Sequence, residues 1–276
     1  MRKTRIIKHS LIHLFLIALG ISAIFPFIWM LSTSLKDTSL VFTYPPVLIP
    51  DPPMWSNYVE VWVMANMLRA MGNSLFISVI SQGGNIIMSS MVAYAFAKID
   101  FKFKNILFIM VLATVMIPFQ VTLIPLFVIF RHLNWINTFY PLIVPPMFGT
   151  ALCVFLMRQY FMRIPDAYRD SAYVDGCGHV RIWWKIFMPM SVPMIFSIGV
   201  LSFMWKWNEF LGPMLFLNSR ELMTVPLVLN IFQTEHVVEW HLLTAASTIA
   251  LAPIIILYLI AQRYVISGIM LGGIKG

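Results

Sequence analysis

Long apolar runs without acidic or basic side chains dominate the chain. Five such runs are 17 to 25 residues long, the length that a helix needs to cross the roughly 30 Å hydrocarbon core of a bilayer. A sixth run, residues 190–217, is interrupted only by Lys206 and Glu209. Because a helix satisfies its own backbone hydrogen bonds in lipid, the pattern predicts an all-α integral membrane protein with six transmembrane helices. The predicted spans are residues 11–31, 73–97, 106–130, 141–157, 190–217 and 242–262.

Composition agrees with this interpretation and excludes several classes of protein. Of the 276 residues, 60% are hydrophobic and 11% are charged, whereas a soluble domain has about 25% charged residues. An ordinary cytosolic enzyme, a disordered chain and a coiled coil are therefore excluded. The net charge of +8 on so apolar a chain reflects where Lys and Arg lie around a membrane, so we expect no nucleic acid partner. We expect residues 1–276 to form a single transmembrane domain.

The basic residues also predict the orientation of the chain. If both termini lie in the cytoplasm, the cytoplasmic segments hold 14 of the 19 Lys and Arg residues, as the positive-inside rule requires. The first span is long for the apolar part of a cleaved signal peptide, so we expect it to be retained. The longest outside gap, residues 32–72, contains five prolines and predicts an ordered cap with a short helix near residues 57–62. It is too short to hold a soluble catalytic domain.

The longest inside gap, residues 158–189, carries the signals of two short helices. Pro165 suits the first turn of a helix, and Asp166 suits the positive end of the helix dipole. Gly176 is expected to take the left-handed conformation that ends this first helix. A second helix is predicted over residues 179–188, where a proline follows.

Physical chemistry alone leaves two interpretations of this segment open. In the first, the helices form a compact unit on the cytoplasmic side, with Ala172 and Cys177 as small contact residues and Asp170 as a charged one. In the second, they form an amphipathic hairpin that lies on the bilayer, with Trp183 and Trp184 in the membrane interface.

The segment resembles the cytoplasmic signature of the permease subunits of ATP-binding-cassette importers. Asp170-Ser171-Ala172 takes the place of the usual Glu-Ala-Ala, and Asp175-Gly176-Cys177 takes the place of Asp-Gly-Ala. Trp207-Asn208-Glu209-Phe210 resembles a segment of the carbohydrate-uptake branch, and residues 272–276 are similar to the C-terminus of the maltose-type six-span permease. Two departures are mild: Asp170 is one methylene shorter than Glu, and Ser171 adds a hydroxyl.

The resemblance implies a type I importer permease fold in the cytoplasmic (inner) membrane of a bacterium or archaeon. It also implies four kinds of partner: a second homologous permease, two copies of an ATPase that bind the ATP, an extracytoplasmic solute-binding protein, and a carbohydrate. This chain would then be no enzyme and would hold no cofactor of its own. The residues that the resemblance places at the ATPase are Asp170, Ser171, Ala172, Tyr173, Asp175, Gly176 and Cys177.

Polar side chains in the fifth span form a second candidate site. Lys206 and Glu209 are three residues apart and thus on one helix face, and ionisable groups in a membrane indicate function. Together with Trp205, Trp207 and Asn208 they provide flat apolar faces and hydrogen-bonding groups, which a sugar pathway needs. The structural alternative is that Lys206 extends to the interface and pairs with Glu209.

Other polar positions favour structural roles. Ser81, Asn85, Ser89, Ala93 and Ala97 recur every four residues in the second span, a ridge of small side chains that lets helices approach closely. Lining of the solute pathway is the alternative role of this ridge. Prolines on both sides of Gln120 predict a broken third helix.

Absent motifs narrow the functional classes. The sequence has no G-x-x-x-x-G-K-[ST] nucleotide loop and no H-E-x-x-H metal motif. The resemblance makes a permease subunit of an ATP-driven importer the leading hypothesis. A stand-alone secondary transporter or channel for a small polar solute is the alternative, and an intramembrane enzyme ranks third.

Overall fold

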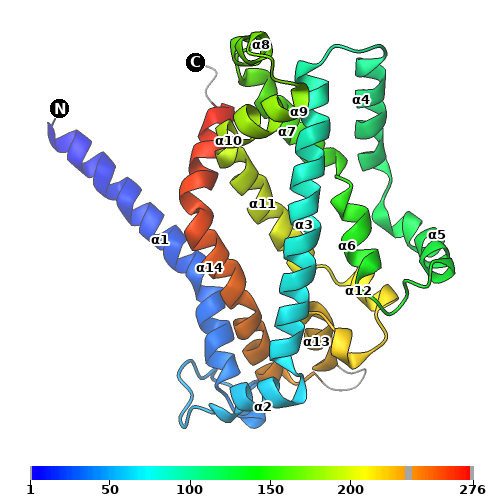
Figure 1. The fold of residues 1–276 in the computed structure, drawn as a ribbon. Coiled ribbons are helices and arrows are strands. Elements are labelled where there is room, and N and C mark those ends of the chain that lie inside the picture. Colours follow the sequence, from blue (N-terminus) through cyan, green and yellow to red (C-terminus); the bar gives the residue numbers. More distant parts are fainter. Residues whose placement is uncertain (1, 234–237, 274–276) are drawn as a thin grey trace. The chain divides into compact units, whose positions relative to one another are not determined.

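The computed structural model describes the backbone of residues 2–233 and 238–273 and the side chains of residues 9–233 and 238–262. Within these residues every regular element is a helix (Figure 1). The chain divides into two units, which are described separately. The first comprises Met1–Leu68 with Val228–Ala252, and the second comprises Arg69–Leu227 with Pro253–Gly276.

Four of the six predicted spans are helices long and apolar enough to cross a membrane. They contain α1 (Arg2–Ser34), α3 (Met67–Lys98), α6 (Tyr140–Met147) with α7 (Ala151–Arg163), and α14 (Trp240–Gly273). The predictions for the first, second, fourth and sixth spans are thereby confirmed.

The third predicted span is broken. Helix α4 (Lys104–Ala113) continues through the 3₁₀ turn η2 (Thr114–Met116), and α5 (Phe119–His132) follows at an angle of 95°. Pro118 lacks a backbone N–H and disfavours helical geometry at Ile117, which is extended. The predicted break in the third span is confirmed.

The fifth predicted span is also shorter than its apolar run. Helix α11 (Val192–Trp207) begins after a 79° bend at Ser191, and α12 (Leu211–Phe216) is a separate short helix. The side-chain amide of Asn208 donates to the Met204 carbonyl over 2.7 Å, so it takes up a carbonyl at the helix end. A continuous helix over residues 190–217 is therefore wrong. With each bent pair taken as one span, the described residues give six.

The first unit contains the predicted cap. Helix α2 (Ser56–Met64) lies where a short helix was expected, and the 3₁₀ turn η1 (Thr38–Leu40) precedes it. The buried side chain of Asn57 donates to the carbonyls of Ser34 and Lys36, both over 2.9 Å. These bonds attach α2 to the end of α1 and explain why a proline-rich segment is ordered.

The second unit is held by the ridge of small residues on α3. Ser81, Asn85, Ser89 and Ala93 are all buried. The backbone N–H of Thr150, in the break between α6 and α7, donates to the Asn85 side-chain oxygen over 2.8 Å. The interpretation of this ridge as a helix-packing surface is confirmed. Further along the chain, the 3₁₀ turn η4 (Arg220–Leu222) and α13 (Val225–Ile231) follow α12.

Two adjacent glycines of α3 provide a test of this packing. A Cβ at Gly84 would lie 2.6 Å from the Met147 Cγ, whereas a Cβ at Gly83 would meet no atom within 4 Å. In an open helix position, alanine is favoured over glycine by roughly 0.5–1 kcal/mol, but overpacking costs about 1–3 kcal/mol. We expect Gly84→Ala to lower the thermal unfolding midpoint in detergent and Gly83→Ala to raise it. Equal shifts for the two variants would contradict the packing.

Candidate functional site

The segment of residues 158–189 folds as two helical parts joined by a glycine turn. Helix α8 (Ala167–Val174) forms the first part; α9 (His179–Ile182), the π-helical turn η3 (Trp183–Phe187) and α10 (Met188–Met190) form the second. Both parts lie at the end of α3 where α4 begins (Figure 1). The two predicted helices are thereby confirmed.

Gly176 ends α8 in the way the sequence predicted. Its φ angle is +78°, which side chains with a Cβ rarely adopt. The N–H of Cys177 donates to the Ala172 carbonyl over 2.9 Å, and the N–H of Gly176 donates to the Tyr173 carbonyl over 3.0 Å. These two bonds are the Schellman pattern of a glycine-terminated helix, and they fix the direction in which the chain leaves α8.

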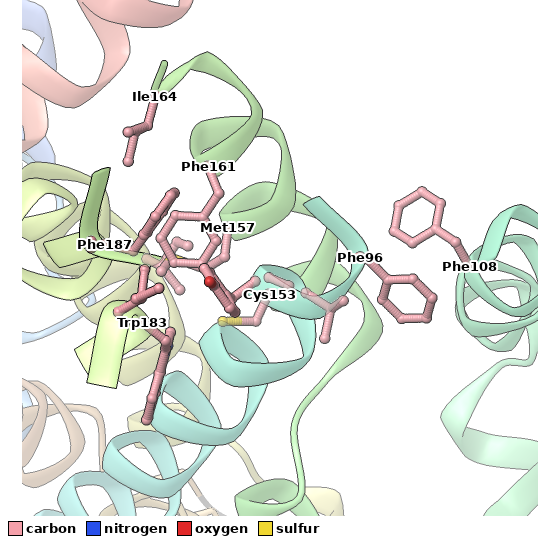
Figure 2. Close-up of a cluster of buried hydrophobic side chains, with 14 residues drawn as sticks. Phe96, Phe108, Cys153, Met157, Phe161, Ile164, Trp183 and Phe187 are labelled. Atoms are coloured by element: carbon pink, nitrogen blue, oxygen red, sulfur yellow. The ribbon is translucent and has the colours of Figure 1, made fainter. Parts of the chain in front are cut away.

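The two parts pack on a buried aromatic core of the second unit (Figure 2). The Phe187 ring meets Phe161 of α7 edge-on at 5.5 Å between ring centroids and Tyr94 of α3 at 5.0 Å. Trp183 is buried, and its indole N–H donates to the Ser90 hydroxyl of α3 over 3.2 Å. Trp183 is therefore not available for the membrane interface, whereas Trp184, the other tryptophan of the hairpin interpretation, is 53% exposed.

The predicted contact residues divide into an inner and an outer set. Ala172 is buried against this core, so the expectation that it packs directly on a partner is wrong. Tyr173 is 59% exposed, and Val174, which the sequence did not single out, is 88% exposed. Cys177 is half-buried against the core. The chain's own Ala172–Cys177 turn therefore presents Tyr173 and Val174 outward.

The polar members of the predicted set are exposed. The Asp170 carboxylate is 60% exposed and lies 2.8 Å from the guanidinium of its neighbour Arg169. The Ser171 hydroxyl donates to the Ala167 carbonyl over 2.8 Å, which keeps it on its own helix. Asp175 is the last residue before the glycine turn and is exposed. Asp170 can therefore meet a basic partner only by sharing or leaving Arg169.

Asp166 is the N-cap residue of α8, but its side chain accepts no capping hydrogen bond. Its carboxylate instead accepts a hydrogen bond of 2.7 Å from the Lys98 ammonium at the end of α3. That bond, with the charges of Lys98 and Arg169, holds the pKa of Asp166 below its ordinary value. Asp166 therefore lies at the N-terminus of α8, as predicted, and also forms an ion pair between two elements.

A pocket of about 630 Å³ forms the second candidate site. Its lining includes Gln82 and Asn85 of α3, with Trp205, Lys206 and Glu209 at the end of α11. The ammonium of Lys206 lies 2.6 Å from the Glu209 carboxylate, and the two side chains are only 9% and 24% exposed. The predicted ion pair is confirmed, and it places two charges in a largely apolar pocket.

Two predicted pathway residues do not line this pocket. Trp207 is 2% exposed and stacks on Phe203, so its predicted role as an open sugar-stacking face is wrong. Asn208 is exposed, and its amide is bound to Met204 within the helix end. Trp205 is 66% exposed and does line the pocket. Neighbouring tryptophans on a helix point in different directions, and only packing decides which one is buried.

For α3 the sequence favoured helix packing over lining of the pathway, and the structure shows that α3 also lines the pocket. Asn85 was assigned to helix packing, and it fills both roles: its oxygen binds Thr150, and its amide donates to Gln82 over 3.0 Å. Both amides face the space that Lys206 and Glu209 also line. An amide among serines and alanines on one ridge was the available signal.

Comparison with known families decides the class of the protein. A family model described as binding-protein-dependent transport system inner membrane component matches residues 85–270. The chain belongs to this family. The matched residues include the 158–189 segment and the pocket-lining residues other than Gln82.

Known relatives match the chain along its whole length. The arabinooligosaccharides transport system permease protein AraQ of Halalkalibacterium halodurans is 32% identical, with 100% of this chain and 99% of the relative covered. The probable starch degradation products transport system permease protein AmyC of Thermoanaerobacterium thermosulfurigenes is 33% identical, with both chains fully covered. The trehalose/maltose transport system permease protein MalG of Thermococcus litoralis is 30% identical, with 99% of each covered.

A solved structure shares the fold. One chain in a crystal structure of a bacterial ABC transporter involved in the import of the acidic polysaccharide alginate is 22% identical, with a TM-score of 0.82. The similarity covers 96% of this chain and 98% of that one. The predicted importer permease fold and inner-membrane location are confirmed. The orientation of the termini and the roles of the contact residues stay predictions, and residues 274–276 of the C-terminal motif lie outside the described residues.

The ion pair in the pocket predicts a non-additive effect on stability. Glu209→Gln leaves the little-exposed Lys206 ammonium without its counter-charge, which costs roughly 1–3 kcal/mol. We expect a lower thermal unfolding midpoint for Glu209→Gln and substantial recovery in the double variant Glu209→Gln/Lys206→Met, because both charges are then gone. Unfolding in detergent measures both. A double variant no more stable than the single one would show that the pair is not coupled.

Proposed function

We propose that this chain is one of two permease subunits of an ATP-driven importer and forms half of the pathway for a sugar or oligosaccharide. The observation that carries the proposal is the 158–189 segment, a pair of short helices fixed on the core with an exposed outer face. The relatives named for arabinooligosaccharide, starch-product and trehalose/maltose transport support the choice of solute class.

The segment supplies the surface that an ATPase subunit grips. Tyr173 and Val174 project from α8 beside the exposed carboxylates of Asp170 and Asp175. An exposed ion pair contributes only about 0–1 kcal/mol, so the shape and apolar area of the outer face carry most of the docking. Two copies of the ATPase bind and hydrolyse the ATP. This chain holds no cofactor and catalyses no reaction.

The pocket supplies part of the solute pathway. The exposed Trp205 ring suits the apolar face of a pyranose, and the amides and charges around it suit hydroxyl groups. A solute-binding protein outside the membrane delivers the sugar, and the second permease completes the pathway. We place both termini in the cytoplasm, in agreement with the distribution of Lys and Arg.

A reconstitution experiment tests the proposal against a stand-alone transporter or channel. The chain is purified with its neighbouring permease, ATPase and binding protein, and sugar uptake is measured in proteoliposomes. An importer subunit retains the ATPase and takes up sugar only when ATP is supplied on the ATPase side. Uptake by this chain without the ATPase would establish the alternative.

Gly176 and Gly178 form a matched pair for testing the coupling segment. A Cβ at either position would meet no atom within 4 Å, but only Gly176 has a positive φ angle. A β-branched residue there costs roughly 1–3 kcal/mol of backbone strain and redirects the chain after α8. We expect Gly176→Val to reduce sugar uptake per ATP hydrolysed by about fivefold or more, an effect of about 1 kcal/mol, while Gly178→Val leaves it unchanged. Equal behaviour of the two variants would refute the role of the turn.

The pocket predicts which residues near the end of α11 affect transport. At saturating binding protein, Trp205→Ala is expected to lower the maximal uptake rate about fivefold, the effect of losing about 1 kcal/mol of ring contact. Glu209→Gln is expected to lower it as well. Met214→Ala is the control, because Met214 of the neighbouring helix α12 is exposed and lies outside the pocket lining. Unchanged rates for both pocket variants would remove the pocket from the pathway.

A further inference from the structure

Lys98 is the last residue of α3, and its buried ammonium joins separate parts of the 158–189 segment. The ammonium donates to the Ile164 carbonyl over 2.6 Å and to the Asp166 carboxylate over 2.7 Å. It also lies 5.7 Å from the centre of the Phe187 ring. The backbone carbonyl of Lys98 in turn accepts a 2.7 Å hydrogen bond from the Arg169 guanidinium of α8. We call these contacts of Lys98 the Lys98 clamp.

The clamp contains one side-chain contact from each helix to the other, so it restricts relative movement of α3 and α8. The Lys98 side chain of α3 binds Asp166 at the start of α8, and the Arg169 side chain of α8 binds the carbonyl at the end of α3. A buried ammonium is costly without a counter-charge, so Lys98 favours the arrangement in which Asp166 stays bound. The Asp166 side chain is 59% exposed, whereas that of Lys98 is 3% exposed. If Asp166 moved into solvent, the buried Lys98 ammonium would lose its counter-charge.

The 158–189 segment is connected to α11 and to α3 in different ways. Toward α11 the chain runs through the π-helical turn η3 and then bends by 79° at Ser191. Toward α3, an unbroken helix, the segment is attached by the Trp183–Ser90 hydrogen bond and the Phe187–Tyr94 ring contact. The Lys98 clamp adds the attachment of α8 to the end of α3. Helix α3 carries Gln82 and Asn85 of the pocket, which lie about 20–24 Å along the helix from Lys98 at 1.5 Å per residue.

We propose that Lys98 is a positioning residue for energy coupling: its clamp makes α3 move with α8 and so carries movement of the 158–189 segment to the pocket. This inference rests on the proposed importer function and adds to it the element that transmits the movement. In this proposal, helix α3 transmits the movement, and the Lys98 clamp attaches α3 to the segment that binds the ATPase.

The test uses the complete importer in proteoliposomes and measures ATP molecules hydrolysed per sugar transported. Lys98→Met removes the charge but keeps most of the side-chain volume, and the exposed Asp166 carboxylate can then be solvated, so the fold is preserved. We expect the ratio to rise by about fivefold or more, the lower end of the effects measured for coupling between linked sites. The ATPase is expected to remain bound.

A second variant and two controls separate coupling from folding. Asp166→Asn weakens the clamp from the α8 side and is expected to raise the ratio in the same way. Asp166→Glu keeps the charge and is expected to preserve coupling. Lys102→Met removes a positive charge from the same connection, where its ammonium lies over the Phe103 ring, and is expected to leave the ratio unchanged.

Each other outcome overturns the inference in a recognisable way. An unchanged ratio in Lys98→Met and Asp166→Asn, with the ATPase retained, shows that α3 does not transmit the movement through the clamp. Loss of the ATPase in these two variants alone shows that the clamp serves docking rather than transmission. If the unaltered chain retains no ATPase, the proposed importer function fails first and the clamp proposal falls with it.

Discussion

In hydrocarbon, a backbone N–H or C=O group without a partner costs several kcal/mol, so a transmembrane helix can break only where the protein takes up the freed group. The breaks in this chain follow that constraint. Between α6 and α7, the N–H of Thr150 binds the Asn85 side chain. At the end of α11, the Asn208 amide binds the Met204 carbonyl. Before α5, Pro118 has no N–H to satisfy. Each of these breaks thus has a side chain that takes up a backbone group, or a proline that has no N–H.

The same constraint explains where the two candidate sites lie. The pocket contains Asn85 and borders the α6–α7 break, because a side chain that satisfies a break also brings polar atoms into the membrane. The 158–189 segment lies at the other end of α3, where η3 and the bend at Ser191 interrupt the path into α11. Helix α3 is unbroken between the pocket and the 158–189 segment, so movement at one end of the helix can be transmitted to the other.

Local signals made part of this structure predictable. Apolar runs predict spans because lipid acts on each residue in the same way, and Gly176 predicts its turn because only backbone sterics decide it. Side chains that depend on distant packing could not be predicted. Trp207 is buried and Trp205 is exposed, although both are tryptophans on one helix. Lys98 and Asp166 are 68 residues apart, and no periodicity within either segment relates them. Ala172 matched a contact motif, yet the core of its own chain covers it.

The Lys98–Asp166 and Lys206–Glu209 pairs show why an ion pair's place in the fold decides what it can do. Lys206 and Glu209 are three residues apart at the end of α11, so their bond constrains about one turn and leaves other helices free. That pair can place charges in the lining of the pocket without linking opposite walls of the pocket. Lys98 and Asp166 belong to different helices, and their bond removes a relative movement of α3 and α8. Of these two pairs, only Lys98–Asp166 can transmit displacement between elements, because Lys206 and Glu209 lie within one turn and do not connect two helices.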